Sequence, residues 1–379
     1  MNRLCHALLP IALTLIWSAS SLLHAQTYQV IHHFAEFVDG SHPSGLTRDN
    51  AGNFFGTTYE GGPSGTLGTV FKMDSSHAVT VLHTFAGPPD GANPLARVTL
   101  DSAGNLYGTT QTGGINHFGT VFKIAPTGAE TILHSFNQLN GEFPSAALTR
   151  DPAGNMYSTT FEGGLYGGGV VFRINTFGTG RTLYQFAGAD GFWSVGGLAR
   201  DSKGNLYGTT FAGGTYNAGS VYKLARNGTE TVLHSFTGGV DGGSPGAEPV
   251  LDSAGNLYST TTFGGDFGLG TVFKVDRTGN FSVVHSFGGA DGDGPIAGLV
   301  LDSAGNLYGN TIRGGDFNLG VVFKIDPFGN ETVLHSFAGG ADGARPISTL
   351  LLSPDGTIFG STQEGGFHQS GTLFRLKPS

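Results

Sequence analysis

The chain has 379 residues, and its 28 acidic and 19 basic side chains give a formal net charge of −9 at pH 7. Only 12% of the residues are charged, which argues against a nucleic-acid partner, because such proteins present dense basic surfaces. Glycine and proline are abundant, at 65 and 16 residues, but they recur at fixed places between apolar segments, so they indicate ordered turns rather than disorder.

The first 25 residues have the features of a secretory signal peptide. Arg3 is followed by an apolar segment, 7–23, and by a tolerable cleavage site that ends at Ala25. The segment contains proline and serines and is short for a membrane span, so we expect cleavage and no span in the mature protein. The single cysteine, Cys5, would be removed with it, which leaves residues 26–379 without disulfides and favours an exported bacterial protein, periplasmic or extracellular.

The remainder of the chain repeats with a period of about 50 residues. The same register begins at Asp49, Asp101, Asp151, Asp201, Asp252, Asp302 and, in degenerate form, Ser353. Each unit holds four β-rich segments separated by Gly, Asn and Asp, which in the sixth unit are 296–301, 306–311, 320–325 and 331–337. Four β-segments per unit in seven units predict an all-β fold, a seven-bladed β-propeller of four-stranded antiparallel blades over residues 26–379. This fold is preferred to a β-solenoid.

The two ends of the chain predict how the ring closes. A fourth-strand segment, 28–34, precedes the first complete unit, and the chain finishes with a third strand at 371–376. We expect these segments to pair in the last blade, which also removes exposed sheet edges. Small residues such as Ala96 and Gly197 occupy the first strands, which we expect to line a narrow central channel.

The recurring text DSxGNLYGTTxxGG, followed by GTVFKI and ETVLHSF, spans essentially residues 28–379. It resembles the Gloeo-Verruco ("GloVer") tandem-repeat family of exported bacterial proteins, and its Asp-x-x-Gly-Asn-Leu-Tyr portion is similar to NHL-type propeller repeats. The resemblance implies a propeller fold and export. It implies no particular activity and supplies no catalytic residues.

Positions that recur in every unit are interpreted as scaffold. The fourth strand carries His32, His83, His134, His234, His285 and His335, with Tyr184 in the remaining copy. These side chains would be spread around the ring, so we expect each to be hydrogen-bonded between blades. Asp101 and its equivalents are expected to cap backbone N–H groups in tight turns.

A second recurring set of polar residues lies in the loops that join the blades. Its members, each followed by Gly, are Asp39, Asp90, Asn140, Asp190, Asp241, Asp291 and Asp342. If these side chains converged at the channel mouth, they could bind Ca²⁺, which prefers oxygen ligands. The Asp-Gly pair is also ordinary turn chemistry, so our expectation is no cofactor and no metal, with Ca²⁺ left open.

A single binding site must come from positions that differ between units. The blade-joining loop and the loop between the second and third strands should emerge on one face, and the third and fourth units are the most distinctive there. The candidate ligand-binding residues are Glu142, Phe143, Glu162, Tyr166, Phe192, Trp193 and Tyr216. Only here is the proline after the variable pair replaced, by Ser194. Aromatic rings and carboxylates suit a sugar, although these rings could equally fill the loop layer.

Secondary candidates address the possibility of an enzyme, whose catalytic residues stay unknown. Glu60 and Glu364, on the two blades joined at ring closure, are the pair to inspect for a glycoside hydrolase. A polysaccharide lyase would use His117, Tyr166 or His368 as base with Arg313 or Arg345 as the cation. The sequence has no HExxH, Walker, GxSxG or dinucleotide-binding motif.

These patterns lead to three hypotheses of function. The first is an exported recognition module that binds a glycan or a surface protein through the variable loop face. The second is a polysaccharide-active enzyme, a lyase or glycoside hydrolase, that uses the same face, and the third is a structural envelope protein. We expect a monomer, and the fold by itself does not decide between the three.

Overall fold

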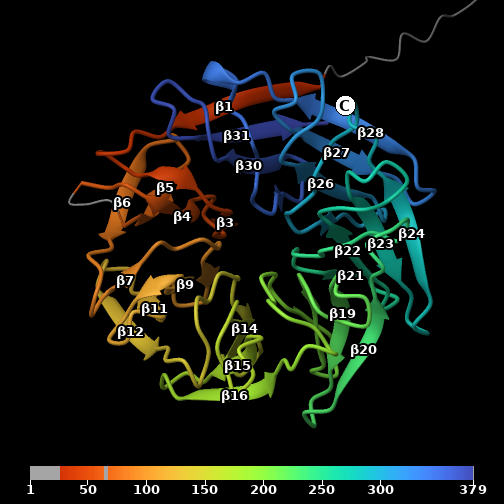
Figure 1. Cartoon of the computed structure of the whole chain (residues 1–379). Helices are drawn as coiled ribbons and strands as arrows, with labels where there is room; N and C mark the ends of the chain where they lie inside the picture. The colour runs from red at the N-terminus through yellow and green to blue at the C-terminus, as the bar shows by residue number, and fades with distance from the viewer. Residues whose placement is uncertain (1–25, 64–66, 379) are drawn as a thin grey trace, which may run out of the picture.

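The computed structural model describes residues 26–63 and 67–378, and over them the chain forms the predicted seven-bladed β-propeller (Figure 1). Seven antiparallel sheets surround a central channel, and in each blade four strands follow one another from the channel to the outer rim. Within this part of the chain, no helix combines the length and apolar character that a membrane crossing requires. The predicted signal peptide lies outside the described residues.

The strand bounds follow the repeat. Blade 1 contains β3 (Thr47–Arg48), β4 (Phe54–Glu60), β5 (Thr69–Met73) and β6 (Val79–Thr84). Blade 2 contains β8 (Thr99–Leu100), β9 (Leu106–Thr110), β11 (Thr120–Ile124) and β12 (Glu130–Ser135). Blade 3 contains β13 (Thr149–Arg150), β14 (Met156–Thr159), β15 (Val170–Ile174) and β16 (Gly180–Gln185). Blade 4 contains β17 (Ala199–Arg200), β18 (Leu206–Thr210), β19 (Ser220–Leu224) and β20 (Glu230–Ser235).

The remaining blades have the same pattern. Blade 5 contains β21 (Val250–Leu251), β22 (Leu257–Thr261), β23 (Thr271–Val275) and β24 (Phe281–Ser286). Blade 6 contains β25 (Val300–Leu301), β26 (Leu307–Thr311), β27 (Val321–Ile325) and β28 (Glu331–Ser336). Blade 7 contains β29 (Leu351–Leu352), β30 (Ile358–Thr362), β31 (Thr372–Lys377) and β1 (Thr27–His33). The loops add the short strands β2 (Ser41–Pro43), β7 (Gly91–Ala92) and β10 (Thr112–Gly113) and a 3₁₀ turn, Gly340–Asp342.

The innermost strands are shorter than the sequence predicted. In blade 6 we expected 296–301, but only β25, its last two residues, forms a ladder with β26. The residues before it accept from the preceding blade instead: the Thr260 hydroxyl donates to the Ala297 carbonyl at 3.4 Å. The same contact recurs in blade 5, where Thr209 donates to the Ala247 carbonyl at 3.0 Å, and in blade 7, where the Asn310 amide donates to the Ser348 carbonyl at 2.8 Å. These bonds satisfy the backbone where seven strands converge and a continuous ladder has no room.

Aromatic rings form the core between blades. The phenylalanine that ends each fourth strand packs edge-to-face on the third-strand aromatic of the next blade, as Phe85 does on Phe122 at 5.2 Å. Such contacts are favourable beyond the burial of their area. Gly108 allows this packing, because a Cβ there would lie 2.4 Å from the Phe122 ring. In the blades that carry it, this glycine therefore leaves room for the ring, whereas Ser158 and Ser259 take its place in blades 3 and 5.

The predicted ring closure is confirmed. Strand β1 pairs antiparallel with β31, from Thr27 opposite Lys377 to His33 opposite Thr372, so the two ends of the chain share blade 7. Tyr28 stacks on His335 of blade 6 at 3.6 Å and donates its hydroxyl hydrogen to the Asp342 carbonyl at 2.7 Å. Strand β1 thereby fastens blade 7 to the preceding blade as well as completing it.

Candidate functional site

The blade-joining loops and the loops between second and third strands lie side by side on one face, which we call the loop face. A backbone bridge joins them in blade after blade; in blade 3 it links Glu142 and Glu162 through N–H···O distances of 2.7 and 3.1 Å. Phe192 and Ala212 repeat this bridge in blade 4, and Asp293 and Arg313 repeat it in blade 6. The two variable positions of a blade are therefore direct neighbours.

Glu142 and Glu162 stand out among these bridged neighbours. Over the described residues, theirs is the bridge that brings two acidic side chains together. Glu142 is buried, and its burial, with the charge of Glu162 adding to it, raises the pKa of Glu142. A carboxyl group of this kind can donate a hydrogen bond at a pH where an exposed glutamate only accepts.

Phe192 and Trp193 are adjacent in sequence but differ in what they do. Phe192 packs against Gly168 and Gly188, where added Cβ atoms would meet its ring at 2.6 and 2.9 Å, so it fills the loop layer. Trp193 is 38% exposed and stacks on Phe161 with the ring centroids 5.5 Å apart. Trp193 is thus the member of the pair that presents an aromatic face to solvent.

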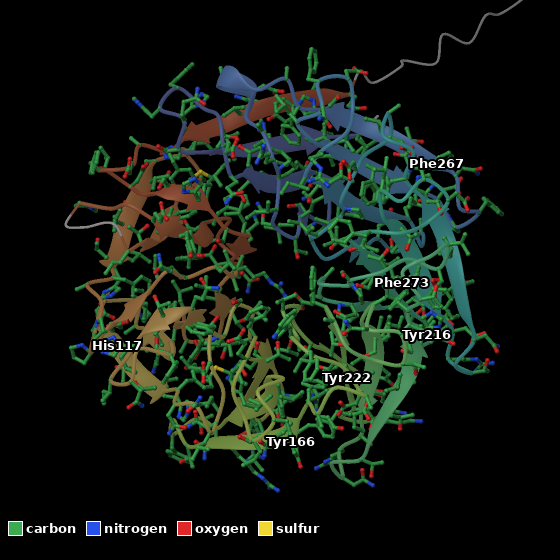
Figure 2. All side chains as sticks on the ribbon, in the orientation of Figure 1. His117, Tyr166, Tyr216, Tyr222, Phe267 and Phe273 are labelled. Carbon is green, nitrogen blue, oxygen red and sulfur yellow. The ribbon has the colours of Figure 1, made fainter. Side chains whose placement is uncertain are left out.

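The other aromatic candidates do not form one cluster with Trp193. Phe143 is half-buried and packs edge-to-face on Phe118 at 6.1 Å. Tyr166 and Tyr216 are 63% and 62% exposed and lie toward the outer rim of their blades (Figure 2). His117, considered with Tyr166 as a possible lyase base, falls one residue later in the repeat than Tyr166, at a left-handed position with φ 69° that aligns with Gly167.

The secondary candidates are engaged in separate local contacts. Arg313 forms a bidentate ion pair with Asp293, at 2.8 and 3.1 Å. Glu364 lies 3.4 Å from the Arg345 guanidinium, and Glu60 lies 3.8 Å from His42, so each of the two acids proposed as a hydrolase pair has a partner within its own blade. His368 lies in the exposed turn after β30 and contributes to lowering the pKa of His33, behind burial and His32.

The replacement of proline by Ser194 has a structural explanation. The Ser194 hydroxyl donates to the Thr209 carbonyl at 2.9 Å and lies 3.3 Å from the hydroxyl of Tyr222. Tyr222 is fully buried at the third-strand position that phenylalanine occupies in the other blades. Because a buried hydroxyl needs a partner, the two substitutions compensate one another, and Ser194 is not a mark of the binding site.

A central cavity of about 410 Å³ opens beside the loop-face positions. Its lining includes the small inner-strand residues that the sequence predicted there, such as Ala96 and Gly197, together with Phe161 and Phe211. Since Phe161 lines the cavity and stacks on Trp193, the tryptophan lies beside the cavity wall.

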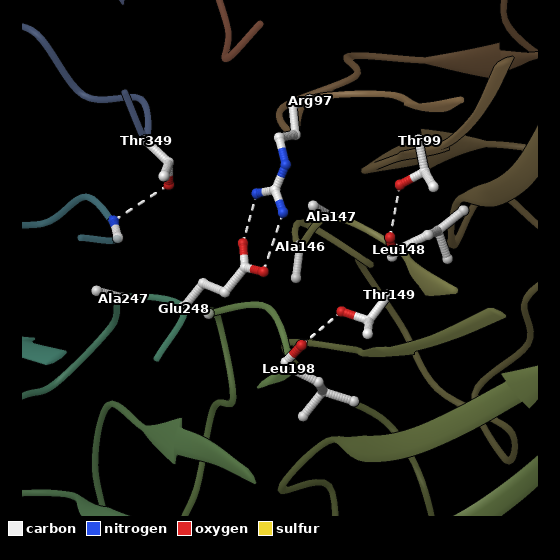
Figure 3. Close-up of polar contacts among 12 residues, drawn as sticks. Arg97, Thr99, Ala146, Ala147, Leu148, Thr149, Leu198, Ala247, Glu248 and Thr349 are labelled. Carbon is white, nitrogen blue, oxygen red and sulfur yellow. Dashed lines mark hydrogen bonds and ion pairs between the residues drawn. The ribbon is translucent and has the colours of Figure 1, made fainter. Parts of the chain in front are cut away.

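An ion pair crosses the channel at the base of this cavity, and our sequence analysis missed it. Arg97 of blade 2 binds Glu248 of blade 5 through two hydrogen bonds of 2.5 and 3.0 Å (Figure 3). Among the described residues, they are the charged side chains that line the cavity, and they also line a second cavity of about 390 Å³. The pair therefore separates the channel into two chambers.

A signal for this pair was present in the sequence. Four residues before each repeat-start position, the seven units carry Gly45, Arg97, Ala147, Gly197, Glu248, Gly298 and Thr349. Two opposite charges stand among residues that are otherwise small or neutral. The variable positions considered as site residues from the sequence all lie in loops, whereas Arg97 and Glu248 lie just before the inner strands β8 and β21.

The repeated histidines behave as predicted. Each bonds to the polar residue of the following blade-joining loop, as His285 does to Asp291 at 2.8 Å, and Tyr184 replaces histidine in the same contact with Asp190. This places the Asp-Gly carboxylates beside the outer strands. They do not converge at the channel mouth, which was the premise for a shared Ca²⁺ site. The turn at Asp101 is also confirmed, since its carboxylate accepts from the backbone N–H groups of Ala103 and Asn105.

Comparison with known proteins supports the repeat and the fold. A profile described as the Gloeobacter/Verrucomicrobia repeat matches residues 20–201 and 194–379. No protein of the curated set matches the sequence significantly. The extracellular domain of a candidate one-component system from B. thetaiotaomicron superposes with a TM-score of 0.58 at 10% identity, covering 91% of this chain and 39% of that chain. The present chain thus spans well under half of that protein.

Two more distant structures were also found. A gluconolactonase from Xanthomonas campestris gives a TM-score of 0.46 at 15% identity, covering 73% of this chain and 82% of its own. A candidate gluconolactonase gives 0.46 at 11% identity, covering 93% and 92%.

Proposed function

We propose, from the premise that this chain belongs to the Gloeobacter/Verrucomicrobia repeat family, that it is an exported recognition module that binds a glycan at the loop face. The observation that carries the proposal is the Phe161–Trp193 stack beside the central cavity. The cavity volume of about 410 Å³ lies within the usual range for ligand pockets. A solvent-exposed indole beside it can stack on the apolar face of a sugar ring.

The cavity lining supports binding of the end of a glycan chain. Phe161 and Phe211 offer apolar surface, while Gln111 and Ser145 offer hydrogen-bonding groups for hydroxyls. The ion pair at the base, between Arg97 and Glu248, would stop a polymer from threading through the channel. A terminal sugar would therefore enter the cavity while the next residues of the glycan lie along the loop face.

The test is a glycan array followed by calorimetry with mature protein, residues 26–379. We expect Trp193→Ala to weaken binding at least tenfold, whereas its stability falls by only about 0.5–1.5 kcal/mol, the value of one aromatic contact. Phe328→Ala is the matched control, because Phe328 is 90% exposed in the turn between β27 and β28. Absence of any glycan ligand, or equal binding by Trp193→Ala, would refute the proposal.

A polysaccharide-active enzyme is the second candidate, and one observation favours it. Glu142 is buried with its pKa raised beside Glu162, which is the environment of a general acid. The same glycans should be assayed for depolymerisation. Cleavage that is lost in Glu142→Gln, with binding retained, would assign an enzyme, and binding without cleavage supports the recognition module.

Export is part of the proposal, and the closing strand is consistent with it. Strand β1 begins at Thr27, shortly after the predicted cleavage site at Ala25. Removal of residues 1–25 therefore leaves the pairing of β1 with β31 intact. Amino-terminal sequencing of protein recovered from the periplasm or medium should begin at Gln26. Recovery of uncleaved chain from the cytoplasm would contradict export.

A further inference from the structure

At one interface between blades, a second carboxylate joins the polar contact of the fourth-strand histidine. The histidine Nε2 to aspartate oxygen distance is 2.6 Å for His32–Asp39, 2.8 Å for His285–Asp291 and 3.1 Å for His335–Asp342. Between blades 1 and 2, His83 Nε2 lies 3.3 Å from Asp90 Oδ2. The same nitrogen lies 3.6 Å from Oε1 of Glu130, which comes from the fourth strand of the next blade.

Glu130 contributes an oxygen that the rest of the protein leaves unused. Its side chain is only 15% exposed, and its Oε1 is buried without a hydrogen-bond partner among the described residues, as are the equivalent Oε1 atoms of Glu230 and Glu331; the nearby His83 nitrogen distinguishes Glu130. The distance of 3.6 Å to His83 is too long for a hydrogen bond. Two carboxylates and one imidazole thus face a common point.

We propose that His83, Asp90 and Glu130 bind one divalent transition-metal ion, for which Zn²⁺ is the best match. Their three donor atoms all lie within 4.8 Å of one another. Tetrahedral Zn²⁺ with bonds of about 2.0–2.2 Å holds its ligand atoms about 3.3–3.6 Å apart, which matches the two distances to His83 Nε2. Two carboxylates neutralise the ion, and water supplies the fourth ligand from the solvent-facing side.

The nitrogen donor distinguishes this site from the calcium site considered from the sequence. Ca²⁺ prefers six to eight oxygen ligands, whereas imidazole with carboxylates suits zinc. The site would cross-link the fourth strands of blades 1 and 2, because His83 belongs to β6 and Glu130 to β12. It is separate from the loop-face site and does not depend on glycan binding.

The other interfaces provide internal controls. Between blades 2 and 3, Asn140 and Gly180 replace two of the ligands. Between blades 5 and 6, Glu331 accompanies His285 and Asp291, but the histidine and aspartate are already hydrogen-bonded at 2.8 Å. Among the described residues, His83, Asp90 and Glu130 are the group of three possible ligands whose donor atoms all lie within 4.8 Å of one another, and the Glu331 group is not. Zinc binding is therefore expected at one interface of the ring.

The experiment uses untagged mature protein that has been treated with chelator and then dialysed against Zn²⁺. We expect about one zinc per chain by elemental analysis, a rise in melting temperature on adding Zn²⁺, and no comparable rise with Ca²⁺. Glu130→Gln should weaken zinc binding at least tenfold, whereas the matched variant Glu331→Gln should bind zinc as the parent does. Circular dichroism confirms that both variants are folded.

Two outcomes would overturn the proposal. One is that the dialysed protein retains no zinc. The other is that Glu130→Gln retains as much zinc as the parent or as Glu331→Gln, which would assign the metal to adventitious surface histidines.

Discussion

Arg97 and Glu248 should be energetically coupled, because inside the channel each side chain compensates the charge of the other. Their side chains are 29% and 19% exposed, and the pair is bidentate. Removing one partner of a fully buried pair costs about 3–5 kcal/mol, because a charge is left without compensation. Partial exposure to solvent lowers this cost. We therefore expect each single variant, Arg97→Ala or Glu248→Ala, to lose about 2–3 kcal/mol of unfolding free energy.

The double variant should be far less damaged than the sum of the single variants. With both charges removed, no unpaired charge remains, and the surrounding inner-strand residues are small. We expect Arg97→Ala/Glu248→Ala to lose about 1 kcal/mol, which gives a coupling free energy of about 3–5 kcal/mol in a double-mutant cycle. Urea unfolding followed by tryptophan fluorescence measures all four proteins.

An exposed pair within the same chain serves as control. Arg313 and Asp293 also form two hydrogen bonds, but Arg313 is 45% exposed on the loop face. Their coupling should be about 0.2–1 kcal/mol, as for surface pairs. A channel coupling no larger than this control, or a double variant as unstable as the sum of the single variants, would refute the reasoning.

Three further predictions concern closure, titration and the compensated substitution. Deleting residues 26–35 should lower the melting temperature of the whole protein, since blade 7 loses β1; unchanged melting would disprove the closure. Burial, with Asp291 adding to it, raises the pKa of Glu331 from 4.5 to about 7. The protonated form therefore stabilises the fold below pH 4.5, and this contribution, about 1 kcal/mol after allowance for solvent screening, is lost as the pH rises through 7. Melting curves from pH 4.5 to 8 should show a smaller loss in Glu331→Gln than in the parent, because burial also raises the pKa values of Glu130 and Glu230 to about 7 and these groups remain in the variant; parallel curves would exclude the contribution of Glu331. Ser194→Pro should cost about 1–2 kcal/mol by stranding the Tyr222 hydroxyl, and adding Tyr222→Phe should restore stability; no recovery in urea unfolding would contradict the compensation.

The repeat made the architecture predictable from the sequence. Seven copies show which residues are scaffold, so blade number, ring closure and the hydrogen-bonded role of His285 and its equivalents could all be inferred. The inner strands were predicted too long because extended residues such as 296–299 look like a strand in sequence. Their hydrogen bonds go to another blade, which sequence periodicity does not report.

The candidate site was less predictable because it depends on distances between units. Sequence placed Trp193 and Tyr216 on the same face but could not show that one contacts Phe161 beside the cavity while the other lies toward the rim. It also treated Ser194 as an isolated exception, although the explanation lies 28 residues away in Tyr222. Pairs formed across the ring, such as Arg97 with Glu248, combine two units that look unrelated in the repeat.

The seam between β1 and β31 has a mechanical consequence. Thr27 lies opposite Lys377, so both ends of the polypeptide leave the ring at the same end of one antiparallel pair. A force that draws the two termini apart would load the hydrogen bonds of the seam one at a time, like opening a zipper, instead of shearing them together. The propeller would therefore resist heat as a closed ring yet open readily under tension applied to both ends, whereas a tether attached at one end alone would leave the seam unloaded.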